Sequence, residues 1–268
     1  MSSNFQLEFV PLSEDPSMEW GRIAYVPWDS STMGWGVAEY RLPSPLPEAG
    51  PAWLHVLERW VAAHRVRLVS CAVPGEDFMA QSHLSHLGFH FVDYALCVTL
   101  PNLRQASLPP LDEPLHLAQP EDRETILHIA ESSFSFGRFH NDPFIPNARA
   151  GLRYRQWMER ALDQPRPTTR VYVHRTGASV DGFLHAEVTD TTADLRLAAV
   201  RAPARAPVSG AVLYVSLMHE FKRAGVRRVT AKIGAGNTAV MNLYSAMGFR
   251  FSQPTLSYHW HAKAGSTL

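Results

Sequence analysis

Several features that define particular protein classes are scarce or absent in this chain. Its 268 residues include two cysteines, Cys71 and Cys97, which supply neither a disulfide framework nor a CxxC metal motif. No run of about 18 apolar residues occurs, and the opening MSSNFQLEFVPL is too polar for a signal peptide. Lys plus Arg and Asp plus Glu number 25 each, so no overall charge attracts nucleic acid or an anionic membrane. We therefore expect a cytoplasmic protein with neither of those partners.

The composition is that of a folded globular protein. Hydrophobic residues make up 46% of the chain and charged residues 19%, which excludes extended disorder. A chain of this length forms one large domain or two ordinary ones.

An internal repeat indicates two domains. When the sequence is shifted by 160 positions, residues 41–91 match residues 201–251 at 12 of 51 positions without a gap, whereas chance would give roughly three or four matches. The matches include Gly50 with Gly210 and Gly88-Phe89 with Gly248-Phe249. We interpret this register as a gene duplication.

The proline-rich stretch 101–114 separates the two copies and reads as a linker. We predict a domain over 1–105, a linker over 106–114 and a second domain over 115–268. Hydrophobic periodicity favours an α/β fold. In the second half it predicts strands at 193–200, 227–233 and 249–261, helices at 119–133, 147–163, 210–224 and 238–247, and a hairpin formed by RVYVHRT and GFLHAEV.

The stretch GAGNTAVMNLYSAMGFRF, residues 234–251, carries a family resemblance. It follows a predicted strand, opens a helix, and is similar to the Asn-containing signature ending in L-Y-x-x-x-G-F of the GNAT acyltransferase superfamily. The resemblance covers about residues 115–262. WDSSTMGWG (28–36) and GRFHNDPFIP (137–146) are similar to segments of the dTDP-fucosamine (amino-sugar nucleotide) N-acetyltransferase type, in which a degenerate amino-terminal GNAT domain precedes a catalytic one.

The resemblance implies tandem GNAT folds, each a mixed, mostly antiparallel sheet flanked by helices, with the first copy degenerate. In such a fold the pantetheine arm of acetyl-CoA lies between two central strands that splay apart. The residues at the corresponding cofactor positions here are Leu197, Ala199, Val200, Arg205, Ser209, Gly210, Ala211, Asn237 and Tyr244.

Tyr244 matches the family tyrosine that faces the thioester sulfur, where it acts as the general acid for the leaving thiolate. The alternative is a core residue of an amphipathic helix. Asn237 stands two helical turns earlier and either faces the same groove or caps the helix; one residue can do both. Gly248-Phe249 reads as a structural helix C-cap.

The segment RAPVSGA, residues 205–211, is where the CoA pyrophosphate should meet a helix N-terminus. Arg205 and Gly210 match the ends of the family pattern R-x-x-G-x-G/A. Val208 replaces the middle glycine and Pro207 lacks an N–H group. The sequence therefore leaves undecided whether this loop binds CoA tightly.

His185 and Glu187 are the candidates for the general base, because alternate residues of a strand share one face; a water chain is the alternative. His259 and His261 alternate on the last predicted strand. No cysteine or carboxylate accompanies them at ligand spacing, so we predict no metal.

Arg138, His140 and Asp142 form a charged loop that in the resembled fold covers the acceptor end of the site. An arginine beside aromatic rings suits a nucleotide-sugar, because arginine pairs with a diphosphate and a ring stacks on a base. We assign these three residues and His259 to substrate binding. The alternative is that the loop is solvated and its charged residues do not contact substrate.

The first copy has Leu84 at the position of Tyr244, Asp77 at that of Asn237 and Pro45 at that of Arg205. It lacks the acid and should not catalyse. We predict an acetyl-CoA-dependent N-acetyltransferase acting on a primary amine. The preferred acceptor is an amino sugar of a nucleotide-sugar. The alternatives are another small amine (an amino acid, a polyamine or an antibiotic) and a non-catalytic ligand-binding protein; a homodimer is left open.

Overall fold

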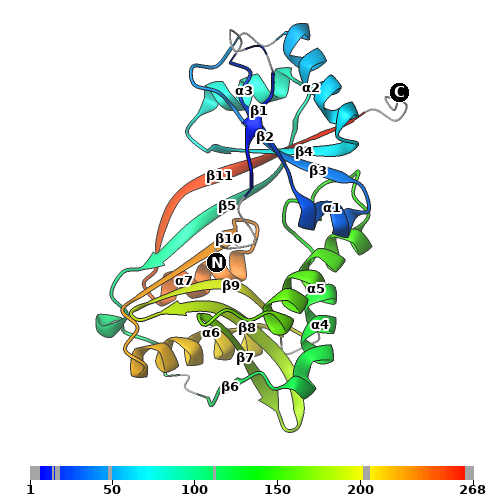
Figure 1. The fold of residues 1–268 in the computed structure, drawn as a ribbon. Helices are drawn as coiled ribbons and strands as arrows, with labels where there is room; N and C mark the ends of the chain where they lie inside the picture. The colour runs from blue at the N-terminus through cyan, green and yellow to red at the C-terminus, as the bar shows by residue number, and fades with distance from the viewer. Residues whose placement is uncertain are drawn as a thin grey trace. The chain divides into compact units, whose positions relative to one another are not determined.

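The computed structural model describes residues 7–13, 15, 19–47, 50–110, 113–201 and 206–262, with the backbone alone for 206–209. The chain divides into two compact units (Figure 1). Unit 1 contains the residues up to Tyr94, the segment Arg138–Ile145 and the residues from Gln253 onward, and unit 2 contains Ala95–Gly137 and Pro146–Ser252. Across the described ranges, no helix combines the length and the apolar character that a membrane span requires.

Unit 1 is a sheet with strand order β1-β2-β3-β4-β11, in which only β3 and β4 run parallel. Apolar residues of α2 recur at Trp53, Leu57 and Val61, a spacing of one helical turn, and all three are buried in its core. Its elements are β1 (Val10–Pro11), β2 (Arg22–Tyr25), α1 (Pro27–Met33), β3 (Gly36–Arg41), α2 (Pro51–Ala63), β4 (Val66–Pro74), α3 (Phe78–His86) and the start of β5 (His90–Leu100).

Unit 2 is a sheet with strand order β5-β10-β9-β8-β7-β6, in which only β9 and β10 run parallel. Its elements are β6 (His116–Leu117), α4 (Arg123–Ser132), α5 (Asn147–Asp163), β7 (Thr169–Thr176), β8 (Ser179–Thr189), β9 (Thr192–Val200), α6 (Ala206–Arg223), β10 (Arg228–Gly234), α7 (Thr238–Ala246) and the start of β11 (Arg250–His261). Two 3₁₀ turns, Leu103–Gln105 and Pro120–Asp122, complete it.

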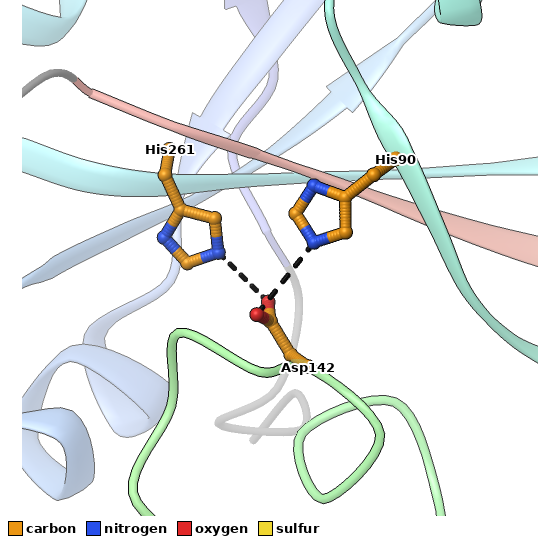
Figure 2. A group of neighbouring side chains, drawn as sticks. All are labelled: His90, Asp142 and His261. Atoms are coloured by element: carbon orange, nitrogen blue, oxygen red, sulfur yellow. Dashed lines mark hydrogen bonds and ion pairs between the residues drawn. The ribbon is translucent and has the colours of Figure 1, made fainter.

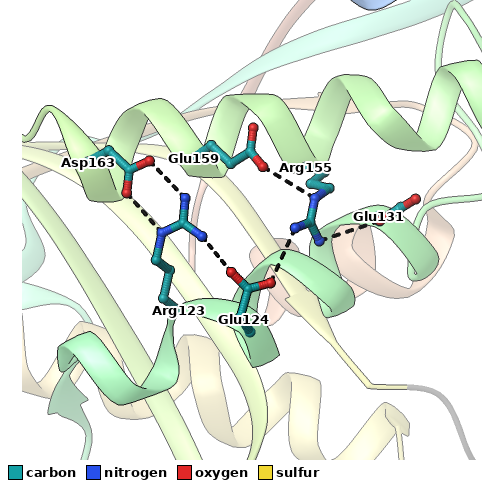
Figure 3. Close-up of polar contacts among 6 residues, drawn as sticks. All are labelled: Arg123, Glu124, Glu131, Arg155, Glu159 and Asp163. Carbon is teal, nitrogen blue, oxygen red and sulfur yellow. Dashed lines mark hydrogen bonds and ion pairs between the residues drawn. The ribbon is translucent and has the colours of Figure 1, made fainter.

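Helices cover both faces of the unit 2 sheet. Leu184 and Ala186 of β8 pack in the core that α6 and α7 cover, whereas Phe183, which points the opposite way, packs in the core that α4 and α5 cover. Salt bridges join α4 and α5 on their outer side (Figure 3), through Arg123, Glu124, Glu131, Arg155, Glu159 and Asp163. Solvent screens exposed pairs of this kind and leaves them with little effect on stability, so the buried apolar face holds the two helices on the sheet.

The two sequence copies fold alike at their best-matched stretch. α3 and α7 are nine residues long and begin exactly one repeat apart, at Phe78 and Thr238. Each ends in the same turn, with Phe89 N–H donating to the carbonyl of Leu84 and Phe249 N–H to that of Tyr244, both at 3.0 Å. The intervening glycines, Gly88 and Gly248, have φ of 83° and 82°, which glycine adopts without strain.

The last strand of each copy completes the sheet of the other unit. Residues Ala95–Leu100 of β5, from the first copy, pair with β10 of the second. Residues Thr255–His261 of β11, from the second copy, pair with β4 of the first. Each unit therefore contains strands from both copies.

The predicted α/β class is confirmed, because both units have mixed, mostly antiparallel sheets flanked by helices. The predicted helix over 147–163 coincides with α5, and the other predicted ends lie within a few residues of those observed. The predicted helix over 119–133 begins instead as a 3₁₀ turn at Pro120–Asp122 and becomes α-helical at Arg123. The domain boundary at 106–114 describes the sequence copies and stays a prediction.

Candidate active site

The parallel strands β9 and β10 of unit 2 separate partway along their length. Their pairing runs from Arg228 opposite Thr192 to Ala231 opposite Leu195, although β9 continues to Val200 and β10 to Gly234. Beyond the last pair, the facing edges of the two strands have no ladder between them. An extended ligand can pair with the backbone N–H and C=O groups of such edges, as an added strand does.

A bulge in β9 lies where the strands separate. His185 of β8 pairs with Leu197 and Ala186 with Leu195, so Arg196 has no partner residue opposite it. The extra residue reverses the alternation of side chains along β9. Leu195 lies in the core under α6 and α7, whereas Leu197 packs in the opposite core.

The predicted cofactor residues of β9 lie on this separated part. Leu197, Ala199 and Val200 are all half-buried, in contrast to Ala193 and Leu195 before the bulge, which are buried. This change in burial accompanies the loss of pairing with β10. The three residues thus line the region in which the sequence predicted the pantetheine arm.

Tyr244 lies in the core that α6 and α7 cover. It is 1% exposed, and its ring packs on Phe249 with centroids 4.5 Å apart and edge-on to Tyr214 at 5.5 Å. Burial raises the pKa of Tyr214 to about 12. Burial, together with the neighbouring Tyr214, raises the pKa of Tyr244 well above its ordinary value. Tyr244 therefore keeps its proton at neutral pH and has it available to donate.

Asn237 caps α7, as one of its two predicted roles required. Its side-chain oxygen accepts a hydrogen bond from the backbone N–H of Val240 at 3.3 Å. Asp77 does the same for α3, with the N–H of Ala80 at 2.9 Å. Both sequence copies therefore have a helix cap at this position. The contact of Asn237 with the cofactor stays a prediction.

His185 and Glu187 lie together on β8, on the face that α4 and α5 cover. His185 Nε2 lies 3.3 Å from Glu187 Oε1. Burial lowers the pKa of His185 against the opposing effect of Glu187, so the imidazole is neutral near pH 7. Burial alone would raise the pKa of Glu187, but hydrogen bonds from Thr168, Thr169 and His185 lower it on balance. The pair is thus a neutral imidazole beside a carboxylate, which can accept a proton.

The N-terminal part of α6 is described incompletely. Arg205 lies outside the described residues, as does the side chain of Ser209. Gly210 and Ala211 are half-buried, and a Cβ atom at Gly210 would meet no atom within 4 Å. Packing against the described residues therefore does not require a glycine there.

The equivalent position in unit 1 lacks a hydroxyl. Leu84 is completely buried in the unit 1 core, at the same place in its helix as Tyr244. Unit 1 consequently has the same helix and turns without the group predicted to act as the acid.

The two segments that resemble the amino-sugar nucleotide N-acetyltransferase type, residues 28–36 and 137–146, meet in unit 1. Arg138 Nη2 donates to Asp29 Oδ2 at 3.2 Å, and Asp29 is 1% exposed. Asp29 belongs to α1, within WDSSTMGWG, and Arg138 to the loop GRFHNDPFIP. A charge-assisted hydrogen bond to a buried carboxylate holds this loop against α1.

Asp142, in the same loop, is surrounded by histidines (Figure 2). Its Oδ2 accepts hydrogen bonds from His259 Nδ1 at 2.6 Å and His261 Nε2 at 2.8 Å, and His90 Nε2 lies 3.6 Å from Oδ1. Burial would raise the pKa of Asp142, but the hydrogen bonds from His259, His261 and the N–H of Phe144 hold it far below its usual range. Asp142 is therefore ionised.

Of the residues predicted to bind substrate, Asp142 and His259 bind each other. His259 is completely buried, and burial lowers its pKa to about 4, so it is neutral and donates through Nδ1. His140, in the same loop, is half-buried, and burial lowers its pKa. Sequence reasoning missed His90, because nothing in its local sequence links it to a loop about fifty residues away.

The predicted site residues thus fall into two groups. Tyr244, His185, Glu187 and the described cofactor residues belong to unit 2, whereas Arg138, His140, Asp142 and His259 belong to unit 1. Within unit 2, Tyr244 and His185 lie on opposite faces of the sheet.

Comparisons with known proteins support the fold. No family model matches the chain. The structure is similar to a GCN5-related N-acetyltransferase from Sphaerobacter thermophilus, with a TM-score of 0.62, 15% identity and coverage of 94% of this chain and 81% of the other. It is also similar to a tandem GNAT protein from the clavulanic acid biosynthesis pathway, with a TM-score of 0.54, 14% identity and coverage of 91% and 80%. The chain has the GNAT fold.

A curated relative is more similar in sequence. The chain is 28% identical over 193 residues to the spore coat polysaccharide biosynthesis protein SpsD of Bacillus subtilis (strain 168). The matched region is 71% of this chain and 66% of the relative. The chain therefore spans slightly less than two thirds of that protein's length.

Proposed function

We propose that this chain is an N-acetyltransferase that transfers the acetyl group of acetyl-CoA to a primary amine. The observation that carries the proposal is the separation of β9 and β10 after Leu195 and Ala231, with a bulge beside it and a buried tyrosine in the core that both strands share. Acetyl-CoA supplies the activated acyl group as a thioester. The free strand edges would hold its extended arm.

The reaction needs a proton acceptor and a proton donor. The amine nitrogen attacks the thioester carbon and forms a C–N bond, after which the C–S bond breaks and the electron pair leaves with sulfur. Tyr244, whose raised pKa keeps the phenol protonated at neutral pH, donates its proton to the departing thiolate. His185, neutral because its pKa is lowered by burial, accepts the amine's proton, with Glu187 holding the imidazole.

For the acceptor we propose an amino sugar of a nucleotide-sugar. Two observations support this choice: the relative at 28% identity is named for polysaccharide biosynthesis, and the loop with Arg138 and His140 is held in place by the buried Asp29. We assign contact with the acceptor to Arg138 and His140. Asp142 and His259, which are buried, position this loop.

Incubation of the full chain with acetyl-CoA and a panel of amines tests the proposal. The panel contains nucleotide-linked amino sugars, free amino sugars, amino acids and polyamines, and thiol release and product mass are both followed. We expect acetyl-CoA to bind, to raise the melting temperature, and to react fastest with a nucleotide-linked amino sugar. Failure of acetyl-CoA to bind at millimolar concentration would refute the proposed acetyltransferase activity. Faster reaction with an amino acid or a polyamine would refute the acceptor alone.

A further inference from the structure

Three side chains capable of binding a metal converge in unit 1 from three separate segments. His90 comes from β5, Asp142 from the loop Arg138–Ile145 and His261 from β11, and one ligand atom of each lies within 4.8 Å of the others. Figure 2 shows both imidazoles directed at the carboxylate. We propose that His90, Asp142 and His261 bind a divalent transition-metal ion of the zinc type.

The spacing of the ligand atoms suits such an ion. Metal–ligand bonds of about 2.0–2.1 Å at tetrahedral angles place neighbouring ligand atoms about 3.4 Å apart. His261 Nε2 lies 2.8 Å from Asp142 Oδ2, and His90 Nε2 lies 3.6 Å from Asp142 Oδ1. These two separations fall on either side of the ideal value, and the three ligand atoms lie within 4.8 Å of one another, so binding one ion requires the side chains to rotate toward it.

The ligand chemistry selects the class of ion. Two imidazole nitrogens and one carboxylate oxygen favour zinc, cobalt, iron or nickel, whereas magnesium and calcium prefer oxygen ligands throughout. His90 Nε2 is buried and makes no hydrogen bond within the described part of the chain. A buried nitrogen without a hydrogen-bond partner is costly, and coordination would use its lone pair.

Further contacts fix the carboxylate in the way that metal sites require. His259 Nδ1 donates to Asp142 Oδ2 at 2.6 Å, and the backbone N–H of Phe144 donates to Oδ1 at 2.9 Å. Metal-binding carboxylates are usually oriented by hydrogen bonds of this kind. His259 is therefore a positioning residue for Asp142.

The two histidines of the cluster lie partly at the surface. The side chains of His90 and His261 are 33% and 22% exposed, and their rings stack with centroids 5.5 Å apart. Phe144 packs on both rings, at 5.6 Å from His90 and 5.1 Å from His261. A bound ion would tie β5 and β11 to the loop that carries Arg138.

Metal binding can be measured on the full chain without a histidine tag, after treatment with a chelator. Cobalt(II) is titrated and its visible absorption recorded, zinc is then used to displace it, and the melting temperature is measured with and without zinc. We expect one ion per chain and a rise in melting temperature with zinc. His90→Ala and His261→Ala should abolish both effects, while His259→Phe should weaken binding about 10- to 100-fold.

His55→Ala is the matched control, because His55 is an exposed histidine of α2 in the same unit, and it should bind the metal like the parent chain. The proposal is overturned if the folded parent chain binds neither ion stoichiometrically, or if His90→Ala retains full binding. None of these readouts depends on acetyl transfer, so the result is independent of the proposed reaction.

Discussion

Replacing Tyr244 and Tyr214 separately by phenylalanine distinguishes a catalytic hydroxyl from a structural one. Both phenols are buried in the same core, so either variant, Tyr244→Phe or Tyr214→Phe, removes the one hydrogen bond that a buried hydroxyl can donate. Both rings remain to pack against each other and, for Tyr244, against Phe249. We expect each variant to lose about 0.5–1.5 kcal/mol of stability, the net value of one hydrogen bond. At about 2–4 °C per kcal/mol, the melting temperature should fall by a few degrees in both.

Turnover should separate the two variants. A positioned general acid contributes about 10²- to 10⁴-fold to kcat, equivalent to about 2.7–5.5 kcal/mol of transition-state stabilisation. This exceeds the cost to stability, so Tyr244→Phe should lose at least 100-fold in kcat with little change in acetyl-CoA affinity, while Tyr214→Phe loses far less. Thiol release under saturating acetyl-CoA measures kcat, and calorimetry measures affinity. Equal kcat losses in the two variants would show that Tyr244 acts only by packing.

Three further predictions concern the cofactor, the base and stability. Gly210→Glu should weaken acetyl-CoA binding at least 10-fold, because a carboxylate would meet the CoA phosphates. The fold should tolerate this substitution, because no described atom would contact a Cβ atom at Gly210 and acidic residues near helix N-termini are favourable. The control variant Gly210→Ala should bind acetyl-CoA normally. The kcat/KM of the parent chain should fall with decreasing pH around a midpoint below 6.5, because the lowered pKa of His185 keeps the base neutral above that point; a midpoint above 6.5 would exclude His185. Burial opposes charging of His174, but hydrogen bonds to Glu113 and Asp181 raise its pKa on balance. The contribution of His174 to stability is therefore complete below pH 6.5 and is lost as the pH rises through the raised pKa. His174→Gln should lower the melting temperature more at pH 5.5 than at pH 9, and an equal loss at both pH values would contradict the linkage.

Local patterns in the sequence accounted for most of the secondary structure. The helix over 238–247 was predicted from Asn237 before it and Gly248 after it, and the observed α7 runs from Thr238 to Ala246. These signals are local, because a cap or a left-handed turn acts within a few residues. The bulge at Arg196 had no comparable signal, since the apolar residues on both sides of it are equally compatible with a regular strand.

Long-range pairing could not be predicted from the same patterns. The matched part of the repeat ends at residues 91 and 251, before most of β5 and β11, so the local pattern does not indicate which sheet each last strand joins. The cluster around Asp142 depends on the exchange of these two strands, because His261 lies 119 residues along the chain from Asp142. The strand of His259 and His261 has no carboxylate at ligand spacing, and the structure provides one from a distant loop. The residue types were noted correctly, but their proximity is a tertiary property.

The exchanged strands have a consequence for how the chain folds. Tyr258 of β11 pairs with Cys71 of β4, so the sheet of unit 1 stays incomplete until almost the whole chain has been synthesised. Contacts this distant in sequence are entropically costly to close and slow folding. The first copy would therefore wait on the ribosome with an open strand edge, a state prone to aggregation. Separate expression of the two sequence copies should give insoluble fragments, and mixing them during refolding should recover the fold.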